Sequence, residues 1–288
     1  MRVLPFKVPK TVNSSFLVQT DDEPHFYDIL HKHPEVQLTA IIESEGTVLI
    51  GDYVGSFKPG DVFLINKNVP HVFKNDKKYY EGNPDLRGYG VSVFFDEHVF
   101  GDKFFKLPET QHIGEFLRKR HSIKLNQEFA ALLLPKIVAL RDKSGVSGVI
   151  ELLSILEILC DADARSTTLA AELLHDITES QAKRLNDIYQ FTMNEFNREI
   201  SLEEIADVAN MTVPSFCRYF KKRTRKTYIE FLTEIRISHA CKMLQKEDIS
   251  ITGISHLSGF NNLSNFNRKF KKITGYTPSG FRKVNFSI

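Results

Sequence analysis

The stretch ISHLSGFNNLSNFNRKFKKITGYTPSGFR, residues 254–282, decides the fold of the C-terminal part. Its centre repeats an earlier segment, because residues 216–224 read FCRYFKKRT and residues 266–274 read FNRKFKKIT, at an offset of 50. The turn ahead of each block aligns Met211 with Phe260 at an offset of 49, so one residue is inserted in the second copy. Self-similarity at a fixed period marks a repeated structural unit. We therefore expect a short helix, a tight turn and a second helix, twice.

Local signals support helices in this region. Ser201 and Glu204 form a capping-box pattern, in which the serine side chain accepts from a backbone N–H of the first turn and the glutamate reaches back. Pro214 suits the first turn of the next helix. Apolar spacing predicts a longer connecting helix over 228–244 and a last helix that ends before Gly275.

The second helix of each copy is expected to present a basic face. In the first copy, Phe216 and Phe220 lie four residues apart, share one face and are predicted to be core. Arg218 lies between them and projects elsewhere, where an arginine can bind guanine bidentately. The lysines 221–222 follow one turn later and suit phosphates. The second copy repeats this arrangement around Arg268, and the repetition disfavours the alternative of a solvated basic face.

Charge divides the chain into an acidic and a basic part. The 288 residues provide room for about two domains of usual size. Residues 1–180 carry 20 Lys and Arg against 26 Asp and Glu, a net charge of −6, whereas residues 181–288 carry 18 against 10, a net charge of +8. On charge alone, the basic part is expected to meet a polyanion, either nucleic acid or a membrane surface.

Several protein classes are disfavoured. No apolar run reaches the length of a membrane span, and the first ten residues lack the apolar core of a secretory signal. The three cysteines are odd in number and form no C-x-x-C pair, which disfavours a disulfide scaffold or a zinc ribbon and fits the cytoplasm. No nucleophile–base constellation or phosphate loop is visible, so the chain is not expected to be an enzyme.

The acidic part begins as strands. Short β-rich runs at 36–42, 47–50, 62–65 and 88–95 alternate with turn residues, which predicts a small barrel or jelly roll. From about Phe104, helical spacing replaces this pattern.

Apolar stripes follow over 129–140 and 149–159, and these helices are expected to pack on the barrel or on a second subunit. We favour an isologous dimer contact for them. The stretch 161–180 is mainly polar and is predicted to be a hinge, with a few leucines that can form a short apolar turn. The expected organisation is therefore α+β, with a sensing and dimerisation domain at 1–165, a linker at 166–180 and a DNA-binding domain at 181–288.

The C-terminal third resembles AraC/XylS-type transcriptional regulators. The shared features are Gly259–Phe260, Ser264-x-Phe266-x-Arg268-x-Phe270-Lys271-Lys272, Gly275-x-Thr277-Pro278 and Phe281–Arg282. The resemblance implies an all-helical DNA-binding domain with two helix-turn-helix motifs.

The resemblance and the repeat together indicate the residues that contact DNA. The predicted DNA-binding residues are Pro214, Ser215, Cys217, Arg218, Lys221, Lys222, Asn262, Leu263, Ser264, Asn265, Asn267, Arg268, Lys271 and Lys272. Because Pro214 and Cys217 are poor hydrogen-bonding residues, the first motif is expected to read fewer bases than the second. Arg225 stands where the second copy has Gly275, so that helix end is either strained or different.

The acidic part resembles the cupin barrel that many regulators of this type carry as a sensor. Metal-binding cupins have a His-x-His pair, then a Glu, and a later His; here Gln37 replaces the Glu. Three imidazoles can bind a divalent ion, but we expect no metal and no other cofactor, since the carboxylate is missing. An organic effector is expected instead, and the predicted effector-binding residues are His31, His33, Glu35, Gln37 and His71.

These patterns predict a sequence-specific transcription regulator controlled by a small molecule. The expected partners are double-stranded DNA, the effector and a second copy of the chain, with RNA polymerase as a candidate and no membrane. A metal-dependent cupin enzyme with a basic tail and an architectural DNA-binding protein without a ligand are the alternatives. The sequence leaves activation and repression open.

Overall fold

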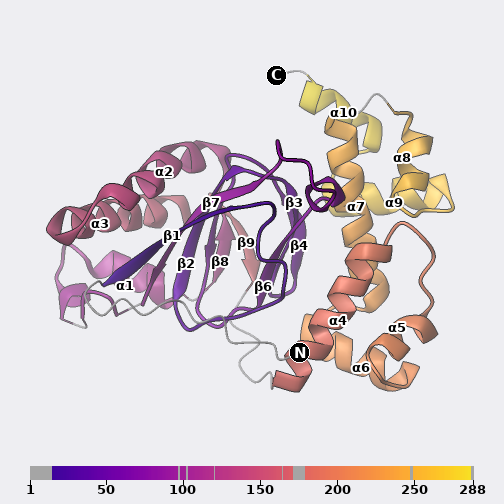
Figure 1. Cartoon of the computed structure of the whole chain (residues 1–288), viewed down its shortest axis with the longest axis horizontal. Coiled ribbons are helices and arrows are strands. Elements are labelled where there is room, and N and C mark those ends of the chain that lie inside the picture. The colour runs from indigo at the N-terminus through magenta and orange to yellow at the C-terminus, as the bar shows by residue number, and fades with distance from the viewer. Residues whose placement is uncertain are drawn as a thin grey trace. The chain divides into compact units, whose positions relative to one another are not determined.

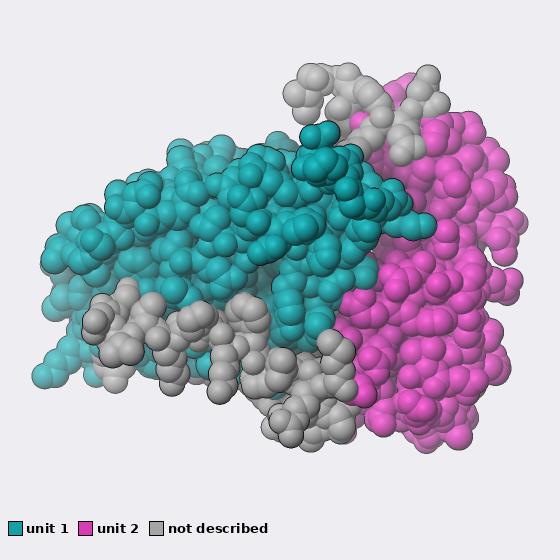
Figure 2. Space-filling model, viewed as in Figure 1, with its two compact units in different colours: residues 1, 3–53, 57–177 teal, residues 2, 54–56, 178–288 magenta. Residues whose placement is uncertain are grey.

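The structure is a computed structural model that describes residues 15–96, 98–101, 103–119, 121–163, 165–170, 179–246 and 249–286. Two compact units divide between residues 177 and 178, with residues 54–56 grouped with the second (Figure 2). The described residues up to 170 contain all the strands together with three helices, and those from 179 onward form helices without strands (Figure 1). The predicted α+β class is confirmed at this level. Among the described residues, no helix is long and apolar enough to cross a bilayer.

The first unit contains two sheets. The six-stranded sheet has the order β1 (Phe16–Glu23), β7 (Gly88–Phe95), β2 (Val36–Glu43), β5 (Val62–Ile65), β8 (Ser122–Lys124) and β9 (Thr167–Ala170). The three-stranded sheet has the order β4 (Tyr53–Phe57), β3 (Gly46–Ile50) and β6 (His71–Asn75). The four strands predicted from the β-rich runs are present to within a residue or so, as β2, β3, β5 and β7.

The two sheets pack against each other through an aromatic layer. Phe57 of β4, Phe63 of β5 and Phe73 of β6 are buried there, and their rings lie 5.4–5.5 Å apart along the row. Offset and edge-on ring contacts of this kind add to the stabilisation that comes from burying apolar area. This layer fixes the separation of the sheets and therefore the width of any space between them.

Three helices cover the opposite face of the larger sheet. They are α1 (Gln111–Arg118), α2 (Gln127–Ala139) and α3 (Gly145–Asp163), and Figure 1 shows them on the side away from β3, β4 and β6. Their apolar stripes, including Leu133 and Leu156, share one core with sheet residues such as Leu38 and Val93. Short 3₁₀ turns η1 (Lys77–Tyr80), η2 (Phe104–Lys106) and η3 (Leu140–Asp142) complete the unit.

The predicted hinge is wrong over much of its length. Residues 161–163 end α3, and residues 167–170 form β9, which pairs antiparallel with β8. Leu169 is buried among the residues between the sheets, so its apolar side chain fixes this segment although its neighbours are polar. Residues 171–178, the rest of the expected linker apart from its end, lie outside the described residues.

The second unit is made of helices. Among the residues described from 179 onward, seven helices occur: α4 (Glu179–Glu195), α5 (Leu202–Val208), α6 (Val213–Thr224), α7 (Tyr228–Lys246), α8 (Ile251–Leu257), α9 (Leu263–Thr274) and α10 (Pro278–Phe286). We call α5 with α6 the first helix pair and α8 with α9 the second helix pair. The long helix α7 connects them (Figure 1).

The internal repeat is visible in the hydrogen bonds of both helix pairs. The side chains of Ser201 and Ser250 cap α5 and α8 by accepting from the backbone N–H three residues later, at 3.1 and 3.0 Å. At the turns, Asn210 and Gly259 have positive φ angles of 52° and 80°. The residue after each of them donates its backbone N–H to the carbonyl five residues earlier, at 2.9 and 3.0 Å.

The two helix pairs form one body. Arg236, in the middle of α7, donates from Nε to the carbonyl of Phe196 at 2.7 Å and from Nη2 to the carbonyl of Arg198 at 2.6 Å. Both acceptors lie just ahead of the first helix pair. Gly259, in the turn of the second pair, packs so closely here that an added Cβ would lie 2.4 Å from the carbonyl oxygen of Phe196. The two helix pairs are therefore joined both by α7 and by the direct contact between Gly259 and Phe196.

Candidate DNA-binding and effector sites

The predicted reading positions lie on one exposed face of each second helix. Phe216 and Phe220 in α6 are 0% exposed, as are Phe266 and Phe270 in α9, so these phenylalanines anchor both helices in the core. Of the fourteen residues predicted to contact DNA, Ser215 is half-buried and the others are exposed. The structure thus places Arg218 and Arg268 at matching exposed positions.

The start of α9 is internally organised. The side-chain oxygen of Asn262 accepts from the backbone N–H of Asn265 at 2.9 Å, so Asn262 is the N-cap of this helix. The guanidinium of Arg268 donates to Oδ1 of Asn265 at 3.0 Å. One oxygen of Asn265 therefore holds the arginine against its own helix while the remaining N–H groups face solvent.

The start of α6 has fewer and longer side-chain hydrogen bonds than the start of α9. Thr212 occupies the N-cap position but makes no side-chain hydrogen bond to the helix backbone, and its hydroxyl donates to Ser215 at 3.1 Å. Arg218 Nη2 lies 3.5 Å from the same serine oxygen, at the outer limit of a hydrogen bond. Cys217 is exposed beside them. The side chains at these reading positions are less constrained than those of α9.

Both reading helices end in the same way. The N–H of Arg225 donates to the carbonyl of Lys221, and that of Gly275 to the carbonyl of Lys271, both at 2.9 Å. Both residues are left-handed, with φ angles of 59° and 81°. Of the two alternatives for Arg225, the structure therefore shows the same left-handed helix end as at Gly275, in which a side chain at positive φ costs about 1–2 kcal/mol relative to glycine.

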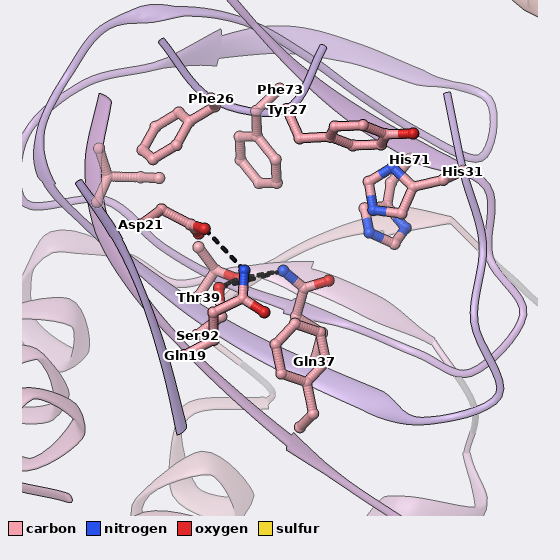
Figure 3. Close-up of a pocket in the computed structure, with 12 residues that line it drawn as sticks. Gln19, Asp21, Phe26, Tyr27, His31, Gln37, Thr39, His71, Phe73 and Ser92 are labelled. Carbon is pink, nitrogen blue, oxygen red and sulfur yellow. Dashed lines mark hydrogen bonds between the residues drawn. The ribbon is translucent and has the colours of Figure 1, made fainter. Parts of the chain in front are cut away.

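A small pocket lies in the first unit between the inner face of the larger sheet, β6 and the segment that joins β1 to β2. It has a volume of about 60 Å³, small beside the roughly 300–1,000 Å³ of pockets for drug-sized ligands. Figure 3 shows aromatic side chains along one side, hydrogen-bonded polar side chains opposite them, and His31 and His71 at one end. The lining residues are Gln19, Asp21, Phe26, Tyr27, His31, Gln37, Thr39, Ile41, His71, Phe73, Ser92 and Phe94.

The polar side consists of two hydrogen-bonded groups that lie on three neighbouring strands. Gln19 and Thr39 flank Ser92 in the strand register, because each pairs with it across the sheet. Nε2 of Gln37 donates to the hydroxyl of Thr39 at 2.7 Å and to that of Ser92 at 3.3 Å. The amide of Gln19 donates to Asp21 at 2.7 Å. Burial nonetheless raises the pKa of the Asp21 carboxyl, which the hydrogen bond from Gln19 only partly opposes.

Backbone pairing places two of the imidazoles side by side. His31 and His71 exchange backbone hydrogen bonds of 3.1 and 2.9 Å, so their side chains emerge next to each other and their ring centres lie 4.4 Å apart. His33 lies 5.1 Å from His71, ring centre to ring centre. Burial lowers the pKa of all three, that of His31 to about 4, so the rings are neutral at physiological pH.

The predicted effector residues do not all reach the pocket. His31, Gln37 and His71 line it, whereas His33 does not, and its Nε2 atom lies 3.0 Å from Oε1 of Gln37. Glu35 precedes β2, and its carboxylate lies 3.6 Å from Nδ1 of His33, so it does not line the pocket.

Other lining residues were not predicted from the sequence. Asp21, Thr39, Ser92 and Phe94 are among them, and along β1, β2 and β7 they alternate with residues on the face that the helices cover. Because side chains along a strand alternate between its two faces, this period of two could have identified these residues from the sequence.

Comparison with known proteins agrees with the helical unit. Residues 205–284 match the family model described as "Helix-turn-helix domain". An uncharacterised HTH-type transcriptional regulator of Bacillus subtilis, YdeC, is 29% identical over 115 residues, which are 40% of this chain and 40% of YdeC. The HTH-type transcriptional activator RhaS of Pectobacterium carotovorum is 25% identical over 271 residues, 89% of this chain and 88% of that one.

A solved AraC-type regulator from Chromobacterium violaceum is 19% identical and covers 38% of this chain and 98% of its own, with a TM-score of 0.36. The family match and the regulators that resemble the chain define a DNA-binding protein of the helix-turn-helix class. Within that class, the chain is similar over most of its length to the transcriptional activator RhaS, which agrees with the resemblance of its C-terminal third to AraC/XylS-type transcriptional regulators. The comparisons lend no support to the alternative of a metal-dependent enzyme.

Proposed function

We propose that the chain binds a specific DNA sequence through two helix-turn-helix motifs and that a small molecule in the first unit controls this binding. The two helix pairs are the motifs, with α6 and α9 in adjacent major grooves. The observation that carries this proposal is the repeated exposure of Arg218 and Arg268 on helices anchored by buried phenylalanines. A recognition helix needs this division between an apolar and a reading face.

The two motifs contribute unequally. Asn265 and Arg268 form a preorganised pair in α9, and an arginine can donate bidentately to guanine while asparagine suits adenine. In α6, Pro214 and Cys217 occupy reading positions with little hydrogen-bonding capacity. The second motif therefore supplies most of the base discrimination, and the lysines after Arg218 and Arg268 supply contacts to phosphates.

The first unit acts as a cupin-like sensor. The pocket offers a carboxyl group, amides and hydroxyls opposite a wall of aromatic rings, which is the lining expected for a compact polar ligand. A ligand shifts the DNA-binding equilibrium only if it prefers one arrangement of the protein over another. The coupling expected for such a ligand is about 1–3 kcal/mol, or roughly 5–150-fold in DNA affinity.

The proposal extends to the assembly, partners and location of the protein. A dimer through the exposed residues of α2 and α3 would place two DNA-binding units on repeated half-sites. RNA polymerase is a further proposed partner, and the cytoplasm is the proposed location.

Selection of bound duplexes from a random pool by the purified full-length protein tests the proposal. Enrichment of a discrete motif, with affinity at least tenfold above that for a shuffled duplex, is the expected result. Absence of any enriched motif would refute sequence-specific binding. Screening small polar metabolites for an effect on affinity for the selected duplex then tests the sensor. The Thr39→Val/Ser92→Ala double variant, which removes two pocket hydroxyls, should lose that response and keep basal DNA binding.

A further inference from the structure

The pocket of the first unit contains a carboxylate without a basic partner. Asp21 of β1 is half-buried and lines this pocket, and the neutral amide of Gln19 donates to its Oδ1 atom at 2.7 Å. Among the described residues, no lysine or arginine lines the pocket, and the charged neighbour that acts on Asp21 is a second carboxylate, that of Glu23. A charged group removed from water is ordinarily paired with the opposite charge. The partner that is missing here is a cation.

The strand pairing leaves space beside this carboxylate for aromatic rings. Asp21 pairs with Gly90 of β7, where an added Cβ would lie 3.2 Å from the ring of Phe26. Figure 3 shows the rings of Phe26 and Phe73 along the side of the pocket opposite the polar groups. Aromatic rings attract a cation that lies over their faces, and they also cover an aliphatic chain. The pocket therefore combines a negative charge with a wall that suits an organic cation.

The other end of the pocket accepts a hydrogen bond. Nδ1 of His71 donates to the carbonyl of Val69 at 2.8 Å, so the proton of this neutral imidazole is on Nδ1 and its Nε2 atom has a lone pair. Among the residues that the structure describes, this Nε2 atom is buried and has no hydrogen-bond partner. His71 is 0% exposed, so bulk water does not reach it. Buried polar atoms are rarely left unpaired, and a donor on a bound ligand would pair this one.

The polar side chains of the pocket have few protons to donate. The hydroxyls of Thr39 and Ser92 lie 2.9 Å apart, so one of their two protons is used between them. The amide nitrogen of Gln37 is directed at the same two hydroxyls, at 2.7 and 3.3 Å. An anionic ligand would therefore meet a carboxylate and few donors, whereas a ligand rich in donors would meet acceptors at both ends.

We propose that this pocket binds a compact organic cation, namely a primary alkylammonium ion that carries a second hydrogen-bond donor. The ammonium group would pair with Asp21, the short chain would lie against Phe26 and Phe73, and the second donor would reach Nε2 of His71. Figure 3 shows Asp21 and His71 toward opposite ends of the pocket, so the two donors belong at the two ends of the ligand. A volume of about 60 Å³ limits the ligand to a few non-hydrogen atoms.

This inference rests on the proposed function, because it names the chemical class of the ligand that the sensor takes, but its test uses no DNA. The full-length protein is titrated by calorimetry at neutral pH with three probes of similar size. These are 3-aminopropan-1-ol, which is a cation at this pH, neutral 1,3-propanediol and anionic 3-hydroxypropionate. The cation should bind with one equivalent and at least about tenfold more tightly than either of the others, because only it forms a charge-assisted hydrogen bond to Asp21.

A fourth probe tests the contact with His71. The n-propylammonium ion keeps the charge but lacks the hydroxyl, so it should bind roughly 2–10-fold more weakly than 3-aminopropan-1-ol, as expected for the loss of one neutral hydrogen bond.

The decisive variant is Asp21→Asn, because the asparagine oxygen still accepts from Gln19 while the negative charge is lost. Affinity for 3-aminopropan-1-ol should fall about 10–100-fold, the effect of losing a hydrogen bond to a charged group. Asp22→Asn is the matched control. Asp22 is the next residue of β1, and its exposed carboxylate pairs with Arg87, so its loss should leave the affinity unchanged.

Two results would overturn the proposal: a wild-type protein that does not prefer the cation to the diol and the hydroxy acid, or an Asp21→Asn protein that binds the cation as tightly as the wild type does. If circular dichroism shows that Asp21→Asn does not fold, the comparison of the probes on the wild-type protein decides by itself. Failure of the same preparation to select DNA would count against the proposed function and not against this ligand site.

Discussion

Asn265 and Arg268 are joined by a hydrogen bond of 3.0 Å, one turn apart on the exposed face of α9. The matching pair in α6, Ser215 and Arg218, is separated by 3.5 Å. An arginine held in place loses less side-chain freedom when it meets a base, so more of its interaction energy is realised as affinity. From the unequal distances we expect that, in the proposed complex with DNA, the second motif makes the more discriminating contacts.

Arg268→Ala should weaken binding to the selected duplex by about 1–3 kcal/mol and relax the preference at one base pair, because a bidentate contact is lost. Fluorescence anisotropy with duplexes that vary at single positions measures both effects. Lys271→Ala is the control: it should weaken binding to all duplexes alike and flatten the salt dependence by about one unit. If the Arg268→Ala variant binds the selected duplex as tightly as the wild type does, the assignment of α9 to the major groove is wrong.

Arg225→Gly should stabilise the second unit by about 1 kcal/mol, because the left-handed conformation at φ 59° is strained for arginine and free for glycine. Denaturant unfolding followed by circular dichroism measures the change. The Arg225→Ala variant separates the effect of the charge from the effect of the backbone conformation, because it removes the guanidinium but keeps a side chain at positive φ. If Arg225→Gly is no more stable than Arg225→Ala, the strain does not contribute.

Gly259→Ala should destabilise the second unit by about 3 kcal/mol or more, because positive φ is combined with a Cβ placed 2.4 Å from the carbonyl oxygen of Phe196. Gly275→Ala is matched in backbone conformation, at φ 81°, but its Cβ would meet nothing within 4 Å. It should therefore cost only about 1 kcal/mol. Equal losses in the two variants would show that the close approach at Gly259 is unimportant.

Val146→Glu/Ile150→Glu should convert a dimer to a monomer. These residues lie one turn apart on α3 and are 75% and 61% exposed, and Leu132 on α2 is 52% exposed. Charged side chains at the centre of an apolar interface are strongly unfavourable. Sedimentation of the full-length protein at micromolar concentration measures the change, with the exposed Ile273→Glu of the second unit as the control. A wild-type protein that already sediments as a monomer would contradict this prediction.

The sequence was informative wherever local chemistry determines structure. Ser201, Ser250 and the repeated phenylalanines mark the helix pairs without reference to the rest of the chain, and the strands rich in branched residues are recognisable in the same way. Arg225 was recognised as anomalous only because the repeat offered Gly275 for comparison.

Features that depend on strand register were not predicted. β1 carries the polar run QTDDE and is a strand because it pairs along β7, from Phe16 opposite Phe95 to Glu23 opposite Gly88. β9 has only four residues, of which two are threonines, and burial of Leu169 decides its position. Ser92 joins Thr39 in the pocket only because β7 pairs with β2 in one register. Such pairings involve residues more than forty positions apart, which local patterns do not encode.

Gly259 packs against the carbonyl of Phe196, and Arg236 donates a hydrogen bond to the same carbonyl. Together these contacts fix the spacing of the two helix pairs within the second unit. The distance and rotation between α6 and α9 are set within the second unit by α7 and by these contacts. Since one turn of duplex takes about 10 base pairs, inserting five between the two recognised segments would rotate one of them to the opposite side. If α6 and α9 bind DNA as proposed, surface residues such as Arg218 and Arg268 can be exchanged one at a time to address new sequences, while Gly259 and Arg236, which are not among the proposed DNA contacts, keep the phase between the two segments fixed.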